Sequence, residues 1–254
     1  MPSAKDVTVS TEWLKVMSVG ESGTGKSVFA ASFPVPGFVF DFGKEIISYR
    51  GKDFNYEQYE ISSQGWSKFE NDLVLVRKAV TENKYQTVVI DNLSAMTDLC
   101  MEKAMQLDGK RSPTGGPLWN VHFQMVKNLM EGRLRQMLNL ECNLVFIAHL
   151  DVIKDEEGAV IGVEPSLTGK LSADVPSYFD EVYYHTSRKE GGDTKWFVQT
   201  IPVGRNHGRS RLSGKERLLP DLVENDYHEI IAYLTGKKKK STTTSTQAAT
   251  TKKS

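Results

Sequence analysis

The chain has 254 residues, of which 39% are hydrophobic and 25% are charged, a composition typical of a globular protein with a buried core. Lys plus Arg and Asp plus Glu each total 32, so the formal net charge is zero. No apolar run reaches the roughly 18 residues of a membrane span, the start MPSAKDVTVS lacks a signal-peptide core, and Cys100 and Cys142 are the only cysteines. These features exclude secreted, membrane-spanning and fibrous classes, and we expect a cytoplasmic protein.

The neutral total hides an uneven distribution of charge. Residues 237–254 contain six lysines and no acid, so residues 1–236 keep 26 basic and 32 acidic side chains and a formal charge of −6. Because the tail lacks apolar periodicity, we expect one domain over 1–236 and a disordered Lys/Thr-rich tail over 237–254. The tail is either a solubilising end or a weak electrostatic tether to phosphate backbones. A DNA site on the acidic domain would have to be a local patch.

Strand and helix patterns alternate along the chain. In chain order, the sequence predicts a strand over 12–19, a helix over 27–33, a strand over 37–42, a helix over 67–83 and a strand over 87–91. Further on it predicts helices that flank the Gly/Pro-rich segment 108–117, a strand over 143–148, a long loop or hairpin over 151–169, strands over 181–185 and 195–201, and a helix over 221–234. This order indicates an α/β fold with a mainly parallel sheet and helices on both faces.

A complete phosphate-binding motif follows the first predicted strand. The match to G-x-x-x-x-G-K-[ST] consists of Gly20, Glu21, Ser22, Gly23, Thr24, Gly25, Lys26 and Ser27. Glycines let backbone N–H groups turn toward a phosphate, where the start of a helix adds positive potential. We expect Lys26 to contact the β- and γ-phosphates and Ser27 to ligate Mg²⁺. The sequence therefore predicts a P-loop NTPase with ATP and Mg²⁺ as cofactors.

Asp91 closes the buried run VVID at the carboxyl end of a predicted parallel strand. Open α/β sheets bind their ligands at this edge, and a carboxylate there can hold Mg²⁺ through water. After a complete P-loop, Asp91 is the natural candidate for this second magnesium-binding group.

Several segments together resemble the RecA-like ATPases. VVIDNLSAM (residues 88–96) is similar to their Walker B region, and LVFIAHL (residues 144–150) occupies the place of the strand that ends in a polar sensor. PSYFDEVYYH (176–185) and WFVQTIPVGRNHGRSRL (196–212) look like small phage proteins that have a RecA core and anneal single strands. The resemblance covers most of residues 12–235. It implies an ATPase of the RecA-like class, with single-stranded DNA, other copies of the chain and a single-strand-binding protein as candidate partners.

The resemblance also assigns two polar residues near the phosphates. His149 stands where RecA-like proteins often carry Gln, so it is a candidate γ-phosphate sensor, and a strand-end histidine that caps backbone groups is the alternative. Alignment by strand end puts Gly43 in the place of the catalytic Glu of RecA. Asp41 and Glu45 are the nearest carboxylates, and Glu45 is either the catalytic acid on a wider turn or a solvated surface acid. We therefore expect an ATPase that can be slow.

Basic residues supply the remaining candidates. Arg205, Arg209, Arg211, Lys215 and Arg217 lie close together in the sequence. They are a solvated face, a source of an arginine finger for a neighbouring subunit, or a phosphate-backbone patch. We assign the finger to Arg205 and DNA contacts to Arg209 and Arg211.

The two loops that match the DNA-contacting loops of RecA differ in charge. Lys110 and Arg111 in the first loop, with Trp119 nearby, are DNA-binding candidates because they combine charge with a stacking surface. The second loop carries Lys154 but is net acidic, which argues against a simple DNA cradle. Its acids are Asp151, Asp155, Glu156, Glu157 and Glu164.

The favoured function is a Mg-ATP-dependent, oligomeric RecA-like ATPase that acts on single-stranded DNA in recombination or annealing. Two alternatives remain open. One is a P-loop motor or switch without recombination activity, such as a helicase loader or packaging partner. The other is a nucleotide-stabilised scaffold with little turnover.

Overall fold

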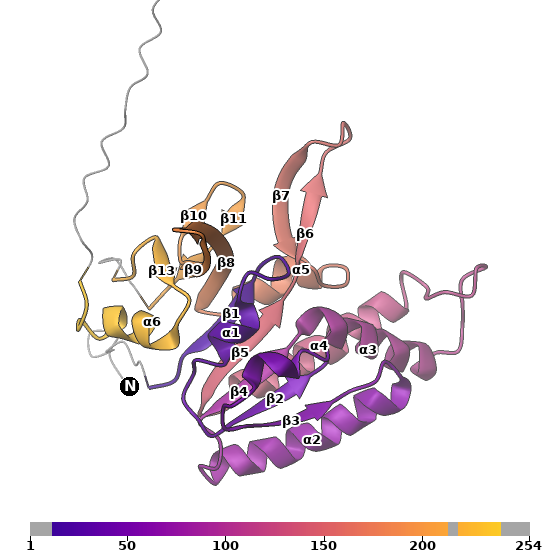
Figure 1. Ribbon diagram of the computed structural model, residues 1–254. Coiled ribbons are helices and arrows are strands. Elements are labelled where there is room, and N and C mark those ends of the chain that lie inside the picture. Colours follow the sequence, from indigo (N-terminus) through magenta and orange to yellow (C-terminus); the bar gives the residue numbers. More distant parts are fainter. Residues whose placement is uncertain (1–11, 213–217, 240–254) are drawn as a thin grey trace, which may run out of the picture.

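The computed structural model describes residues 12–212 and 218–239, which form three layers around one sheet (Figure 1). In spatial order the sheet contains β13 (Leu222–Glu224), β9 (Asp193–Gln199), β8 (Glu181–Glu190), β1 (Lys15–Val19), β5 (Asn143–Ala148), β4 (Thr87–Asp91), β2 (Gly37–Asp41) and β3 (Phe54–Gln58). The six strands from β8 to β3 are parallel, whereas at one end β9 pairs antiparallel with β8 and β13 pairs antiparallel with β9. A short strand, β12 (Arg209–Ser210), pairs antiparallel with β8. The predicted mainly parallel sheet is confirmed.

Helices cover both faces of the sheet. One face packs against α2 (Ser63–Thr81), α3 (Leu93–Leu107) and α4 (His122–Leu138), and the other against α1 (Lys26–Ala30), the 3-10 helix η2 (Ile46–Tyr49) and α6 (Tyr227–Leu234). Neighbouring strand residues point to opposite faces, so Val16 joins the second of these cores while Met17 joins the first. Strands buried on both faces explain the nearly continuous apolar runs in the sequence.

Two hairpins extend the layered core. β6 (Leu150–Lys154) and β7 (Val160–Pro165) form an antiparallel ribbon that projects from the body (Figure 1). β10 (Pro202–Val203) and β11 (Asn206–His207) form a shorter hairpin. The short helices α5 (Leu171–Asp174) and η3 (Val175–Tyr178) connect β7 to β8. Of the two options predicted for residues 151–169, the hairpin is the observed one.

Some predicted boundaries are wrong. The predicted helix over 221–234 begins only at Tyr227, because Leu222–Glu224 pairs with β9 and the side chain of Asp226 caps the helix. The predicted helix over 27–33 ends at Ala30. The strand β3 was not predicted. Lys215, Arg217 and residues 240–254, which are most of the predicted tail, lie outside the described residues.

The parallel strands bring the predicted site residues to one edge. The P-loop follows β1, the link that contains Glu45 follows β2, Asp91 ends β4, and His149 follows β5. Because β5 lies between β1 and β4, His149 emerges between the P-loop and Asp91. Within the described ranges, no helix combines the length and the apolar character needed to cross a bilayer.

Candidate functional site

The glycine-rich loop between β1 and α1 surrounds the ammonium group of Lys26. Nζ of Lys26 donates hydrogen bonds to the carbonyl oxygens of Gly20 at 2.8 Å and Glu21 at 2.7 Å. Gly23 and Gly25 have φ angles of 78° and 87°, in the left-handed region that favours glycine. Burial lowers the pKa of Lys26, while nearby carboxylates act in the opposite direction. The loop thus holds a lysine ammonium group beside two glycines with left-handed backbone, an arrangement suited to phosphate.

A cavity of about 170 Å³ opens over this loop. The residues that line it come from the loop and α1, the β2–β3 link, the end of β5 and the strand β9: Ser22, Gly23, Gly25, Lys26, Ser27, Val28, Glu45, Ser48, His149 and Trp196. Thr24 points elsewhere, since its hydroxyl donates to the carbonyl oxygen of Glu21 at 2.8 Å and tightens the loop. Five of the eight motif residues thus line this cavity, whereas Gly20, Glu21 and Thr24 are not among its lining residues.

Asp91 has a fully buried side chain at the end of β4. Its Oδ2 accepts a hydrogen bond from the Tyr49 hydroxyl at 2.9 Å, and its buried Oδ1 has no hydrogen-bond partner. Burial and then the charge of Glu45 raise the pKa of Asp91 to about 6, whereas the nearby hydroxyl groups of Tyr49 and Ser27 work against this rise. A buried carboxylate oxygen without a partner is costly unless a cation lies beside it. The Ser27 hydroxyl and Asp91 therefore fit Mg²⁺, which prefers oxygen ligands and nucleotide phosphates.

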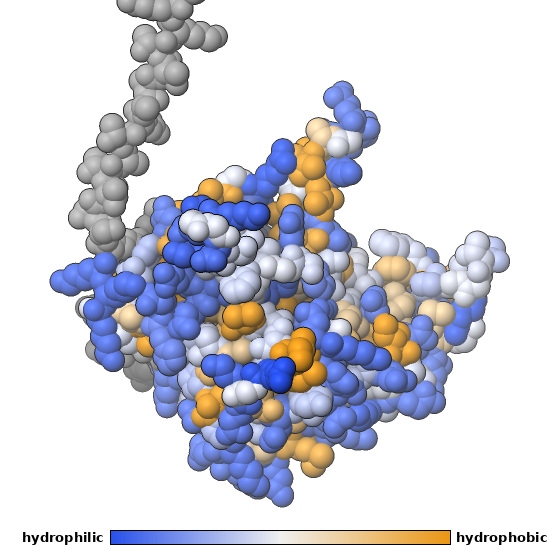
Figure 2. Space-filling model, viewed as in Figure 1, coloured by the Kyte–Doolittle hydropathy of each residue, from blue (hydrophilic) through white to orange (hydrophobic). Residues whose placement is uncertain are grey.

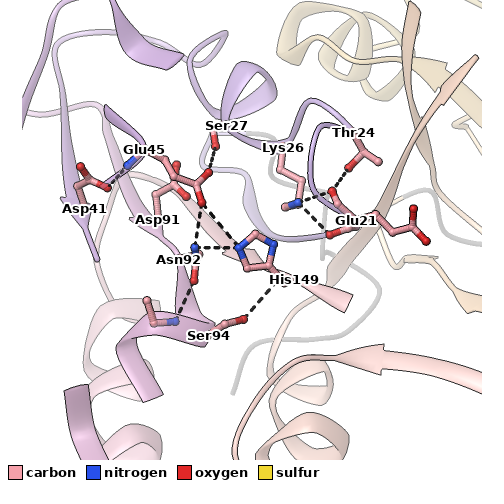
Figure 3. A network of polar contacts seen from close by, with 12 residues as sticks. Glu21, Thr24, Lys26, Ser27, Asp41, Glu45, Asp91, Asn92, Ser94 and His149 are labelled. Atoms are coloured by element: carbon pink, nitrogen blue, oxygen red, sulfur yellow. Dashed lines mark hydrogen bonds and ion pairs between the residues drawn. The ribbon is translucent and has the colours of Figure 1, made fainter. Parts of the chain in front are cut away.

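Glu45 reaches the P-loop from the link between β2 and β3 (Figure 3). Its Oε2 lies 3.5 Å from the Ser27 hydroxyl, and its Oε1 lies 3.3 Å from Nδ2 of Asn92. Nε2 of His149 is 3.7 Å from Oε1 of Glu45 and 3.1 Å from Nδ2 of Asn92. The close approach of the His149 ring is the main cause of the lowered pKa of Glu45, and burial opposes it. An ionised carboxylate therefore lies beside the Ser27 hydroxyl, the candidate magnesium ligand.

The turn after β2 explains why Glu45, rather than residue 43, enters the site. A Cβ on Gly43 would lie 2.7 Å from Nδ2 of Asn92, so a side chain there would collide with the polar network. Asp41 stabilises the turn and the neighbouring strand through both of its carboxylate oxygens. Its Oδ1 accepts a hydrogen bond from the backbone N–H of Glu45 at 2.8 Å, and its Oδ2 accepts one from Nε2 of Gln58 at 2.7 Å. The turn is wider than the strand-end alignment assumes.

His149 directs its ring into the network rather than onto the backbone. The ring faces Glu45 and Asn92 and lines the cavity, while the backbone N–H of His149 donates to the Ser94 hydroxyl at 3.3 Å. Ser94 lies in the first turn of α3, the helix that leads toward the first predicted DNA loop. His149 thus contacts both the polar network at the cavity and the first turn of α3, and its role as a sensor stays a prediction.

The loop is also held by residues that the sequence did not indicate. The indole Nε1 of Trp196 donates to the carbonyl oxygen of Gly23 at 3.0 Å, and Nδ2 of Asn225 donates to that of Gly25 at 2.8 Å. Nδ1 of His185 lies 2.8 Å from Oδ1 of Asn225, and burial lowers the pKa of His185 to about 3, so the ring is neutral. A Cβ on Gly25 would lie 2.8 Å from Cγ of Trp196. The antiparallel end of the sheet therefore fixes the P-loop.

A comparison with protein families matches residues 12–212 to AAA_24, an AAA domain. The chain belongs to this AAA domain family. No curated protein matches the chain. Among solved structures, the KaiC-like protein from Pyrococcus horikoshii OT3 has 13% identity and a TM-score of 0.43, covering 73% of this chain and 77% of that one. The flagellar accessory protein FlaH from Methanocaldococcus jannaschii has 10% identity and a TM-score of 0.38, with 83% of both chains covered.

The family match, the sheet order and the complete P-loop identify the AAA domain as a RecA-like P-loop ATPase. This confirms the predicted fold class and the coarser part of the predicted function. In the described part of the AAA domain, no group of three or more His, Cys, Asp or Glu residues is arranged to hold a metal ion. The Ser27–Asp91 pair remains the candidate magnesium site.

The predicted arginines occupy three different environments in the AAA domain. Arg205 is exposed in the turn between β10 and β11 and does not line the described phosphate cavity. Arg211 is 56% exposed and pairs with Asp180 at 2.9 Å. Nη2 of Arg209 donates to the carbonyl oxygens of Pro176, at 2.5 Å, and Phe179, at 2.6 Å, and burial lowers the pKa of Arg209. Arg209 therefore joins β12 to η3 in this structure, and of the proposed DNA pair only Arg211 is well exposed.

The first predicted DNA loop of the AAA domain is exposed at its basic residues. Arg111 donates to the carbonyl oxygens of Met105, Asp108 and Lys110 and so caps the end of α3, while Lys110 projects beside it. The Trp119 side chain is 70% exposed and packs against Phe123 with ring centroids 4.4 Å apart. The α3–α4 loop stands clear of the body (Figure 1). Charge and an accessible indole thus share one projecting loop.

Proposed function

We propose that the AAA domain hydrolyses Mg-ATP and acts on single-stranded DNA in recombination or annealing as an oligomer. The observation that carries the hydrolytic part is the position of Glu45, held within the same polar network as Ser27, Asn92 and His149. A carboxylate with a lowered pKa stays ionised and can orient a water molecule and accept its proton. When bound, Mg²⁺ would neutralise charge on the β- and γ-phosphates.

Other residues of the chain bind the phosphates and the cation and maintain the shape of the loop. Lys26 supplies the side-chain counter-charge for the phosphates, and the Ser27 hydroxyl and Asp91 hold the cation. Trp196 and Asn225 keep the loop in its curved form through the Gly23 and Gly25 carbonyl oxygens. His149, linked to Glu45 on one side and to α3 through its backbone on the other, can transmit loss of the γ-phosphate to the α3–α4 loop.

Support for the DNA part comes from a different region. Lys110, Arg111 and Trp119 project on the α3–α4 loop, where a flexible strand can approach both charge and a stacking surface. The resemblance of residues 176–185 and 196–212 to phage annealing proteins points the same way. The β6–β7 hairpin contributes little to DNA binding in this proposal, because its acidic residues would repel phosphate.

The test is the ATPase rate with no DNA, with single-stranded DNA and with duplex DNA. We expect stimulation by single-stranded DNA, and we expect Lys110→Ala combined with Trp119→Ala to remove most of that stimulation while leaving the DNA-free rate intact. Lys52→Ala is the matched control, since Lys52 is an exposed lysine just before β3 and is not part of this loop. An ATPase rate that does not change with DNA would favour a motor or switch without recombination activity. Tight ATP binding without hydrolysis would favour a nucleotide-stabilised scaffold.

A further inference from the structure

The link between β2 and β3 contacts Asp91 at both its backbone and its side chain. The backbone N–H groups of Phe42 and Gly43 donate to the carbonyl oxygen of Asp91 at 2.6 and 3.0 Å. Tyr49, at the end of η2 on the same link, donates its hydroxyl to Oδ2 of Asp91 at 2.9 Å. The link therefore fixes the position of the residue and the orientation of its carboxylate.

Tyr49 is itself rigidly placed. Only 3% of its surface is exposed, and its ring meets that of Phe54 edge-on with centroids 5.3 Å apart. It belongs to the same core as Phe29 of α1, the helix that begins with Lys26 and Ser27. A phenol in such packing has little freedom to turn away from Asp91.

The two carboxylate oxygens of Asp91 therefore differ in their hydrogen bonding. Oδ2 is occupied by the phenol, whereas Oδ1 is buried and has no hydrogen-bond partner. A carboxylate with one oxygen engaged cannot rotate freely, so the other oxygen keeps one direction. Groups that orient ligands in this way strengthen metal binding without touching the metal.

We propose that Tyr49 is a positioning residue that holds Asp91 for a divalent cation, an inference that rests on the proposed use of Mg-ATP at this site. Tyr49 acts through Asp91 and touches neither nucleotide nor cation. Glu45 and Tyr49 lie on one short link, so this link supplies both the proposed catalytic carboxylate and the group that orients the cation's ligand.

The test is Tyr49→Phe, which removes one hydroxyl and keeps the ring. ATP binding is measured by calorimetry in EDTA and in Mg²⁺, and Mn²⁺ binding to the protein–ATP complex is measured by electron paramagnetic resonance. We expect ATP affinity in EDTA to stay within about twofold, and affinity for Mn²⁺ to fall by about 10- to 100-fold, the range found for groups that orient metal ligands. If Tyr49 only stabilised the fold, its loss would weaken ATP binding in EDTA and Mn²⁺ binding alike.

The chain offers a matched control. Tyr183 is fully buried and donates its hydroxyl to the buried carboxylate of Glu181 at 2.7 Å, outside the residues that line the phosphate cavity. Tyr183→Phe removes an equivalent hydrogen bond and should leave Mn²⁺ affinity unchanged. An equal loss in both variants would overturn the proposal, because it would show a general effect of weakened packing.

A double-mutant cycle decides whether Tyr49 acts through Asp91. In an Asp91→Asn background, which keeps an acceptor for the phenol, adding Tyr49→Phe should change Mn²⁺ affinity by less than about twofold. Additive losses would overturn the proposal, as would unchanged Mn²⁺ affinity in Tyr49→Phe when the wild-type protein binds Mn²⁺–ATP. A wild-type protein that binds ATP equally well with and without metal would instead contradict the proposed function.

Discussion

The ionised form of Asp91 is electrostatically unfavourable in the folded protein. Burial, with the charge of Glu45 second, raises its pKa from an ordinary 3.8 to about 6. A raised carboxyl pKa means that the contribution of the group to stability is complete below the unfolded value and is lost as pH rises through the folded value. Near neutral pH the ionised Asp91 therefore destabilises the fold by about 3 kcal/mol, at 1.36 kcal/mol per pKa unit. A cation beside Oδ1 would offset this cost.

This cost predicts that Asp91→Asn stabilises the nucleotide-free protein while weakening Mg-ATP binding. In EDTA near neutral pH we expect the free energy of unfolding to rise by about 1–3 kcal/mol, because the amide carries no charge and still accepts from Tyr49. The gain should shrink as pH falls from 6 toward 4, where Asp91 is protonated in the folded protein. Urea denaturation across this range measures it.

The control for this prediction is the exposed Asp53, which lies just before β3. Asp53→Asn should change the free energy of unfolding by no more than about 0.5 kcal/mol, as usual for surface positions. If Asp91→Asn were less stable than the wild type near neutral pH, the assigned burial cost of Asp91 would be wrong.

Residue-level prediction from the sequence was possible where one local pattern identifies the group. The P-loop has a fixed spacing, and Asp91 ends an unbroken apolar strand. Tyr49, Asn92 and Trp196 gave no such signal, because each meets the site through tertiary contacts. Trp196 lies 173 residues from its partner Gly23. Their roles follow only from the folded arrangement.

At the scale of elements, burial on both faces made strands predictable. The predicted bounds of β4 (Thr87–Asp91) and β5 (Asn143–Ala148) are those observed, because every residue in both strands is buried. β3 (Phe54–Gln58) was missed because it is the edge strand and three of its five residues are exposed. Its sequence FNYEQ lacks an apolar run, and only pairing with β2 makes it a strand.

The element β9 links the P-loop to the far end of the sheet through Trp196. The indole donates to the Gly23 carbonyl oxygen and lines the phosphate cavity, so we expect ATP binding to change its fluorescence. Trp196→Phe should remove that signal and weaken ATP binding by about 2- to 10-fold, the value of one hydrogen bond of about 0.5–1.5 kcal/mol. Emission titrations with ATP measure both effects.

Trp119 provides the comparison for this prediction, because it is exposed on the α3–α4 loop. Trp119→Phe should keep both the nucleotide-dependent change and the ATP affinity. A wild-type fluorescence response that survives in Trp196→Phe would assign the signal to another tryptophan and reject the link through β9.

At the scale of the whole molecule, the cavity over the P-loop is lined by one carboxylate, Glu45, and by Lys26, and no arginine of the described residues lines it. Arg205 is exposed at the tip of β10–β11, a hairpin at the end of the molecule that also carries β8 and β9 (Figure 1). Figure 2 shows apolar side chains on the projecting β6–β7 hairpin, where Val152 and Ile161 are 49% and 60% exposed. Because these hairpins present the exposed Arg205 and exposed apolar groups, we expect them to contact another copy of the chain.

The predicted contribution of Arg205 to a neighbouring site can be tested by mixing two inactive variants. Arg205→Ala should fold and bind ATP but lose oligomer-dependent hydrolysis, since fingers of this kind are worth about 10³–10⁵-fold in other NTPases. Lys26→Ala should lose tight ATP binding, because the phosphates lose their main side-chain counter-charge in the loop. Arg77→Ala, which alters an exposed arginine on α2, should keep full activity.

In an equimolar mixture, some interfaces pair the intact P-loop of Arg205→Ala with the intact arginine of Lys26→Ala. A head-to-tail interface uses different surfaces on its two sides, so random assembly should make about a quarter of the interfaces complete. We therefore expect about that fraction of wild-type ATPase activity to return on mixing, although each variant alone is inactive. Light scattering must show that the variants co-assemble. Mixed assemblies without recovered activity would mean that Arg205 serves no neighbouring site, because every other part of that site would be present.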